Sequence, residues 1–293
     1  MKHGLFDAEF VRKLELLRVN FRRQQARHIE GRLTALQRGG RIEFADHRTY
    51  SPGDDLRYLD WRLYARTGKF FIKEFRKDQQ PLVVVLVDAS RSMDWGQPSK
   101  WDFARRVAAA IAFVALSDGH AVDAACFSSE GTRWCGIMVK RSAFFSLLDF
   151  LANAPAAGGT CLAGAVGELT VHHPRACLVV LISDLLDPQG GQSAVGALAA
   201  KGYDVTVLHV LSPQEWRVPW RGPMVLCDLE SGRRRWLVLD DQICQQYVDE
   251  VKRLRESWRS FCASHQALFL TTSTGTPFEE FIMQYLRSGG LLK

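Results

Sequence analysis

Five side chains that carry only oxygen donors stand where they could act together: Asp88, Ser90, Ser92, Thr160 and Asp184. The first aspartate directly follows the apolar run 82–87, and the serines come after it in an Asp-x-Ser-x-Ser pattern. A second apolar run, 176–182, leads to the second aspartate, and the threonine follows two glycines. Hard oxygen ligands suit Mg²⁺, and Mn²⁺ or Ca²⁺ could substitute. The set therefore predicts a magnesium site.

The predicted site leaves room for a ligand from outside the chain. Mg²⁺ prefers octahedral geometry and keeps waters, so a position stays open for water or for a carboxylate of another molecule. A single aspartate at a strand end more often caps the next helix, but five donors at matching positions favour metal binding. Arg91 lies inside the motif and could meet an acidic partner, although solvent exposure alone explains a charged loop residue.

The pattern from residue 81 onward alternates between apolar, β-branched runs and amphipathic stretches. Strands are expected over 82–87, 121–127, 133–139, 176–182, 204–211 and 268–271, and helices over 99–118, 142–153, 161–171, 191–200, 241–263 and 277–287. This order predicts an α/β fold, a three-layer sandwich around a mostly parallel central sheet. Ligands of such sheets bind beyond the carboxyl ends of the strands, which is where the five donors fall.

Three regions have their own character. Residues 1–30 are expected to hold an amphipathic helix that docks its apolar side on the chain's own domain, with peripheral contact to anionic lipid as the alternative. Residues 31–80 combine short strand-like pieces with a dense turn, and residues 224–239 predict a hairpin. The last two regions are expected to form a small β-rich satellite of the domain at 81–293.

The turn near residue 55 is surrounded by charged side chains. A second, partner-binding surface is one interpretation, carried by Asp54, Asp55, Arg57 and Arg66. An internal network of ion pairs and helix caps is the more common role of such a set, with Trp61 and Tyr64 packed beneath it.

The same segment carries a long signature. It consists of residues 44–57, Asp60-Trp61-Arg62, Ala65-Arg66-Thr67-Gly68 and Lys73-Glu74-Phe75. This signature resembles that of the bacterial "domain of unknown function 58" proteins. The Asp-x-Ser-x-Ser motif, with its distant threonine and aspartate, resembles the metal-ion-dependent adhesion site of von Willebrand factor A domains. Together the two regions cover most of residues 30–210, and the resemblance implies a von Willebrand factor A-like, Rossmann-like fold.

The resemblance also implies a partner. Such proteins are typically linked with MoxR-type AAA+ ATPases in chaperone-like assembly or maturation. We therefore expect a non-enzymatic protein-interaction module, in which an Asp or Glu of the ATPase or of its client completes the Mg²⁺ shell. Longer family members carry membrane helices before the signature, whereas this chain resembles the short, soluble members and is expected in the cytoplasm.

Two other function classes stay open. A magnesium-dependent hydrolase could use the same five residues, but the Asp-x-Ser order lacks the second carboxylate of an aspartate-nucleophile phosphatase, and no GxxxxGK[ST] loop occurs. The net charge is +6, and residues 1–80 hold 18 Lys and Arg against 11 Asp and Glu, so a basic surface could bind nucleic acid. Because no zinc-finger, helix-turn-helix or RNP-type motif occurs, nucleic-acid binding is not expected.

Two further observations bear on the compartment. The seven cysteines have irregular spacings and no CxxC pair, which predicts free thiols in a reducing environment. No apolar run reaches the length of about 18 residues that predicts a transmembrane helix.

Overall fold

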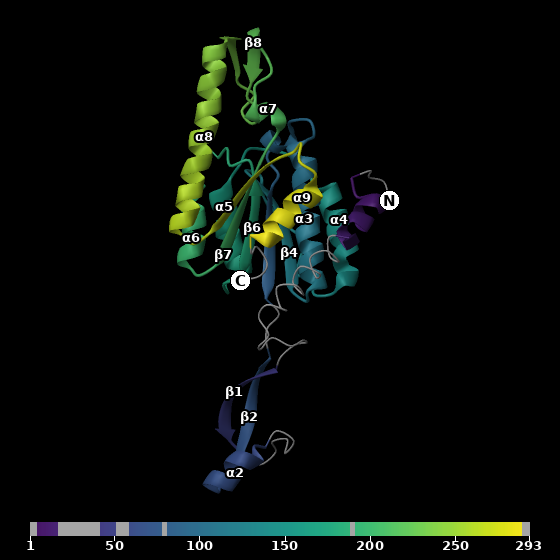
Figure 1. Ribbon diagram of the computed structural model, residues 1–293, viewed down its shortest axis with the longest axis vertical. Helices are drawn as coiled ribbons and strands as arrows, with labels where there is room; N and C mark the ends of the chain where they lie inside the picture. Colours follow the sequence, from purple (N-terminus) through teal and green to yellow (C-terminus); the bar gives the residue numbers. More distant parts are fainter. Residues whose placement is uncertain (1–4, 17–41, 51–58, 78–80, 188–190, 289–293) are drawn as a thin grey trace. The chain divides into compact units, whose positions relative to one another are not determined.

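The computed structural model describes residues 5–16, 42–50, 59–77, 81–187 and 191–288. It divides into two compact units, one made of Met1–Ala26 with Pro81–Lys293 and one made of Arg27–Gln80. The larger unit is built on a six-stranded sheet with the order β10-β7-β6-β3-β4-β5 (Figure 1). Its strands are β3 (Leu82–Asp88), β4 (Ala121–Ser128), β5 (Gly131–Trp134), β6 (Leu178–Ser183), β7 (Asp204–Leu211) and β10 (Leu268–Ser273).

Helices cover both faces of this sheet. The long ones are α3 (Lys100–Ser117), α4 (Phe144–Asn153), α5 (Leu162–His172), α6 (Gln192–Ala200), α8 (Asp241–Ser264) and α9 (Phe278–Arg287). Helices α3, α4 and α9 share one apolar cluster with one face of β3, while α5, α6 and α8 share a second cluster with the other face. Five strands are parallel and only β5 is antiparallel, so the predicted α/β fold is confirmed.

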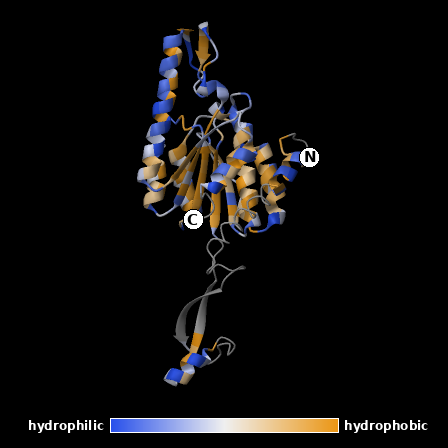
Figure 2. Ribbon diagram, in the orientation of Figure 1, coloured by the Kyte–Doolittle hydropathy of each residue, from blue (hydrophilic) through white to orange (hydrophobic). Residues whose placement is uncertain are grey.

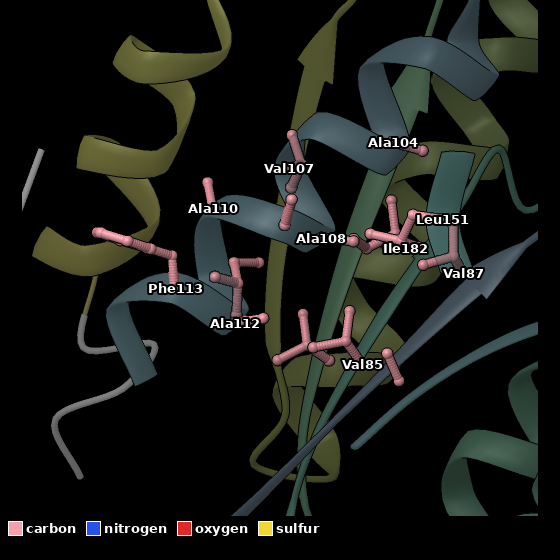
Figure 3. Packing of buried hydrophobic residues seen from close by; sticks show 14 of the residues in the cluster. Val85, Val87, Ala104, Val107, Ala108, Ala110, Ala112, Phe113, Leu151 and Ile182 are labelled. Atoms are coloured by element: carbon pink, nitrogen blue, oxygen red, sulfur yellow. The ribbon is translucent and has the colours of Figure 1, made fainter. Parts of the chain in front are cut away.

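The apolar pattern of the sequence explains these layers. Successive side chains of a strand point to opposite faces, and every residue from Val83 to Val87 is buried because both faces are covered. Helix α3 is rich in alanine, which lets it approach the sheet closely. Figure 3 shows Ala108 of this helix next to Ile182 of β6, and both belong to the same apolar cluster. Apolar residues gather on the central strands, whereas the upper part of α8 is mostly hydrophilic (Figure 2).

The predicted strand at 133–139 is wrong over most of its length. Strand β5 ends at Trp134, and Met138 returns to the sheet only as an isolated bridge to Val122. The break falls at Gly136, which has a φ of 96° that an extended strand does not allow. The carboxylate of Asp123 accepts the Gly136 N–H at 3.0 Å and replaces the lost ladder partner.

A segment between β7 and α8 adds elements that matter for the site. It begins with the short helix α7 (Pro213–Trp216), which was not expected from the sequence, and continues into the hairpin of β8 (Gly222–Cys227) and β9 (Arg234–Leu239). The hairpin confirms the prediction over 224–239. It belongs to the larger unit and leads directly into α8. Its predicted packing with residues 31–80 stays a prediction.

The smaller unit holds an antiparallel pair, β1 (Ile42–Thr49) and β2 (Phe71–Lys77), and the helix α2 (Trp61–Thr67). Asp60 caps α2 by accepting the N–H groups of Arg62 and Leu63 at 2.9 and 3.0 Å, as a capping role predicts. The expectation that Trp61 and Tyr64 are packed is wrong for Trp61, which is 63% exposed on a helix with no buried residue. Tyr64 is also exposed, but its ring stacks on that of Phe70 at 4.4 Å. Arg66 is exposed in the last turn, and Asp54, Asp55 and Arg57 lie outside the described residues.

The N-terminal segment docks on the larger unit. Residues 8–16 are helical, and Phe6, Phe10 and Leu14 are buried in the cluster that contains α9. The ring of Phe10 lies 5.2 Å from that of Phe278, and the Lys13 ammonium pairs with the Glu279 carboxylate at 2.9 Å. Docking on the chain's own domain is therefore confirmed for this stretch, and residues 17–30 of the predicted helix lie outside the described residues. No helix in the described ranges is both long and apolar enough to cross a bilayer.

Replacing Leu14 by Ala tests this docking. Because Leu14 is fully buried, we expect the free energy of unfolding to fall by about 2–5 kcal/mol in a urea titration. Leu16→Ala is the matched control, since Leu16 is 56% exposed and its truncation should change stability by less than about 0.5 kcal/mol. Equal effects of the two substitutions would contradict the docking.

Candidate metal site

Two buried carboxylates meet at the carboxyl edge of the sheet. Strands β3 and β6 are neighbours with Val87 opposite Ile182, so the residues that follow emerge side by side. The Ser183 hydroxyl donates to Asp88 Oδ2 at 2.7 Å, and both Asp88 and Asp184 have no exposed surface. The structure thus brings together the two aspartates that were predicted from separate strands.

The serines complete this corner of the site. The Ser90 N–H donates to Asp88 Oδ1 at 2.9 Å, which curls the loop back over the strand end. The hydroxyl oxygens of Ser90 and Ser92 lie 2.9 Å apart. Ser90 is fully buried, while Ser92 is partly exposed, so the motif runs from the floor of the site to its rim.

The glycine loop brings Thr160 to the same edge. The Arg91 N–H donates to the Gly158 carbonyl at 3.1 Å, and the Gly159 N–H donates to the Ser129 hydroxyl at 2.8 Å. These bonds tie the loop to the motif after β3 and to the turn after β4. Thr160 is partly exposed, and its hydroxyl donates to the Glu230 carboxylate at 3.2 Å.

A lysine that the sequence pattern did not single out neutralises part of the negative charge of the buried carboxylates. Lys100 begins α3 and is only 1% exposed; its ammonium lies 2.7 Å from Asp184 Oδ2 and 2.6 Å from Glu215 Oε1. Burial opposes the charged form, but the two carboxylates outweigh it and raise the pKa of Lys100. Glu215 is fixed in place because it forms a capping box with Ser212 on α7.

Asp88 pairs with no cation among the described residues. Its burial, together with the negative charge of Asp184, raises the pKa of Asp88 from 3.8 to about 7, although the hydrogen bonds from Ser183 and Ser90 act against this rise. A carboxylate held in this state gains stability from any cation placed next to it. The one described histidine on β7, His209, supplies no charge, since burial lowers its pKa to about 4.

The donor set fits a hard divalent cation. Two ligand oxygens on adjacent corners of a Mg²⁺ octahedron lie about 3.0 Å apart, because Mg²⁺–oxygen distances are about 2.0–2.1 Å. The 2.9 Å between the Ser90 and Ser92 hydroxyl oxygens matches that edge. The cluster holds no described cysteine or histidine ligand that would favour a softer metal. The described residues also contain no group of three His, Cys, Asp or Glu side chains that could hold a metal ion by themselves.

The other residues with predicted roles give a mixed picture. The side chain of Arg91 is exposed next to the site, and Arg66 belongs to the smaller unit. All seven cysteines are free, as the sequence predicts, and burial raises the pKa of the Cys126 thiol to about 12, which makes it a poor nucleophile.

Sequence reasoning missed Lys100, Glu215 and Glu230, of which only Glu215 had a local signal, the Ser-Pro-x-Glu capping pattern.

Comparison with known families agrees with the predicted signature. The family model described as "Protein of unknown function DUF58" matches residues 46–257. The chain belongs to the DUF58 family. This DUF58 protein is also similar to the uncharacterized protein Mb1516 of Mycobacterium bovis and the uncharacterized protein Rv1480 of Mycobacterium tuberculosis. Each is 28% identical over 280 residues, covering 94% of this chain and 84% of the relative.

Solved structures give weaker likenesses. The conserved hypothetical protein BatB from Bacteroides thetaiotaomicron aligns with a TM-score of 0.45 and 19% identity, covering 71% of this chain and 98% of that one. An aerotolerance-related membrane protein from Bacteroides fragilis aligns with a TM-score of 0.44 and 20% identity, covering 71% and 99%.

Replacing Lys100 by Met tests the buried ion pairs. The substitution leaves the Asp184 and Glu215 carboxylates buried without their cation, so we expect a loss of about 3–5 kcal/mol in unfolding free energy. Lys252→Met is the control, because Lys252 pairs with Asp249 on the surface at 3.3 Å and such a pair contributes at most about 1 kcal/mol. A Lys100 variant as stable as the control would show that the ion pairs of Lys100 with Asp184 and Glu215 do not stabilise the fold.

The raised pKa of Asp88 predicts a pH dependence in the metal-free protein. A raised carboxyl pKa adds stability that is complete below about pH 4 and is lost as the pH rises through about 7. The stabilisation lost over this pH range is on the order of a few kcal/mol. Asp88→Asn cannot ionise, so its stability relative to the wild type should rise by up to that amount between pH 4 and pH 8, measured by urea unfolding in EDTA. Parallel pH curves for the two proteins would refute the coupling, and Asp149→Asn, at an exposed position, should run parallel to the wild type.

Proposed function

We propose that this DUF58 protein is a non-enzymatic, metal-dependent protein-interaction module. One observation carries the proposal: the site has a fully buried floor of Asp88, Ser90 and Asp184 and a partly exposed rim of Ser92 and Thr160. A cation held by the floor would meet solvent, or another protein, only on the rim side. Such an arrangement suits an ion that binds an external ligand better than it suits a purely structural ion.

The five predicted residues would hold Mg²⁺, with Mn²⁺ or Ca²⁺ as substitutes. When bound, the ion supplies a positive charge that attracts a carboxylate from outside. The residues of the chain orient the ligands of the ion and favour an acidic partner. The Asp88 carboxylate is oriented by Ser183 and by the Ser90 N–H, and Asp184 is held by Lys100. The exposed Arg91 at the rim adds attraction toward an acidic partner surface.

We further propose that the partner is a MoxR-type AAA+ ATPase or its client, and that the protein acts as an adaptor in assembly or maturation in the cytoplasm. The support for the partner is the family resemblance of the signature segment. Support for a reducing compartment comes from the seven unpaired cysteines, of which Cys227 is exposed.

The chemistry around the site supports interaction over hydrolysis. A Mg²⁺-dependent hydrolase needs a positioned nucleophile or general base beside the ion. The position two residues after Asp88 is a serine, and the His209 imidazole at this edge is buried with its pKa lowered to about 4. The Asp184 carboxylate is already paired with Lys100.

A pull-down from native lysate tests the proposal, with the full chain as bait in Mg²⁺ or in EDTA. We expect an AAA+ ATPase, identified by mass spectrometry, to bind the wild type in Mg²⁺ and to be lost both in EDTA and with Asp88→Ala. The exposed Asp149→Ala is the matched control and should behave as the wild type. Partner binding that survives EDTA and Asp88→Ala unchanged would sink the proposal, as would phosphatase turnover that disappears with Asp88→Ala.

A further inference from the structure

Glu230, at the tip of the β8–β9 hairpin, reaches across to the metal site. Its Oε1 accepts the Thr160 hydroxyl at 3.2 Å, and its Oε2 lies 3.3 Å from the Thr160 backbone nitrogen, which donates to it. Seventy residues separate these two positions in the chain. A carboxylate of the chain itself therefore contacts the rim hydroxyl that the proposed site would use as a metal ligand.

The glycine loop is shaped to admit this carboxylate. A Cβ atom added to Gly159 would lie 2.9 Å from Glu230 Oε2, closer than real Cβ contacts come. A side chain at this position would make the end of the Glu230 side chain shift, so the bare backbone of Gly159 leaves room for the carboxylate beside Thr160.

The hairpin presents Glu230 from a defined turn. The Asp228 carboxylate accepts the Glu230 and Ser231 N–H groups at 2.9 and 3.1 Å, and the Gly232 N–H donates to the Asp228 carbonyl at 2.9 Å. Six residue pairs from Gly222–Leu239 to Cys227–Arg234 connect this tip to the base of the hairpin. The base is anchored by Leu239, which is buried.

We propose that Glu230 is a sixth residue of the metal site and occupies the coordination position that a partner's carboxylate would use. The inference rests on the proposed function, since it presupposes the cation. Oxygens on adjacent corners of a Mg²⁺ octahedron lie about 3.0 Å apart, and the 3.2 Å between Glu230 Oε1 and Thr160 Oγ1 fits such an edge. A partner's carboxylate then reaches the ion only when the hairpin tip moves away. Binding of Glu230 to the ion and binding of the partner therefore exclude one another.

The test uses Mn²⁺ alone as the probe, bound to the full chain. Calorimetry gives the affinity, and water-proton relaxation gives the number of waters on the bound ion. We expect Glu230→Gln to admit one additional water and to weaken Mn²⁺ binding at least about tenfold, the lower end of the loss that follows removal of even outer-sphere partners. Glu250→Gln removes the same charge from an exposed pair with Arg253 on α8 and should match the wild type.

Asp88→Asn distinguishes failure of the metal site itself from failure of the role proposed for Glu230. If it abolishes Mn²⁺ binding while Glu230→Gln leaves both the water number and the affinity unchanged, the metal site stands and the role of Glu230 is overturned. If Asp88→Asn binds Mn²⁺ as the wild type does, the metal site itself, and with it the proposed function, fails. Loss with Asp88→Asn together with an added water in Glu230→Gln is the result that the proposal requires.

Discussion

The burial of two carboxylates side by side is the constraint on which this structure depends. Asp88 and Asp184 follow neighbouring parallel strands and are both shielded from water, a costly arrangement unless each negative charge is compensated. Asp184 has its cation in Lys100, at 2.7 Å. Within the part of the chain that the structure describes, Asp88 receives hydrogen bonds from Ser183 and Ser90 but pairs with no cation, and its pKa is raised to about 7. This asymmetry leaves one buried carboxylate in need of a positive charge, and a divalent ion would supply it.

The segment between β7 and α8 depends on the same constraint. It contributes Glu215, which pairs with the Lys100 ammonium at 2.6 Å, and Glu230, which contacts Thr160 at the rim. Both carboxylates come from elements that interrupt the regular alternation of strands and helices. The segment of α7 and the β8–β9 hairpin, at one end of the larger unit in Figure 1, therefore supplies carboxylates to the floor and to the rim of the site.

Sequence patterns predicted the parts of the site that are local to strand ends. Asp88, Ser90, Ser92 and Asp184 follow apolar strands of a parallel sheet, and the rule that ligands gather at that edge placed them together. Lys100 and Glu230 could not be predicted in this way, because neither follows a strand of the parallel sheet: Lys100 opens α3, and Glu230 lies in the turn between β8 and β9. The failure at β5 has a local cause, since the positive φ of Gly136 ends a strand whose apolar residues continue.

Diffraction from crystals of the full chain soaked in Mn²⁺ tests the central claim most directly, because anomalous scattering locates the ion without assumptions about its ligands. We expect a single strong peak among Asp88, Ser90, Ser92, Thr160 and Asp184, within about 2.5 Å of at least one oxygen of Asp88, a generous limit for Mn²⁺–oxygen contacts. No peak at this edge of the sheet at millimolar Mn²⁺, or a peak only at surface carboxylates, would contradict it.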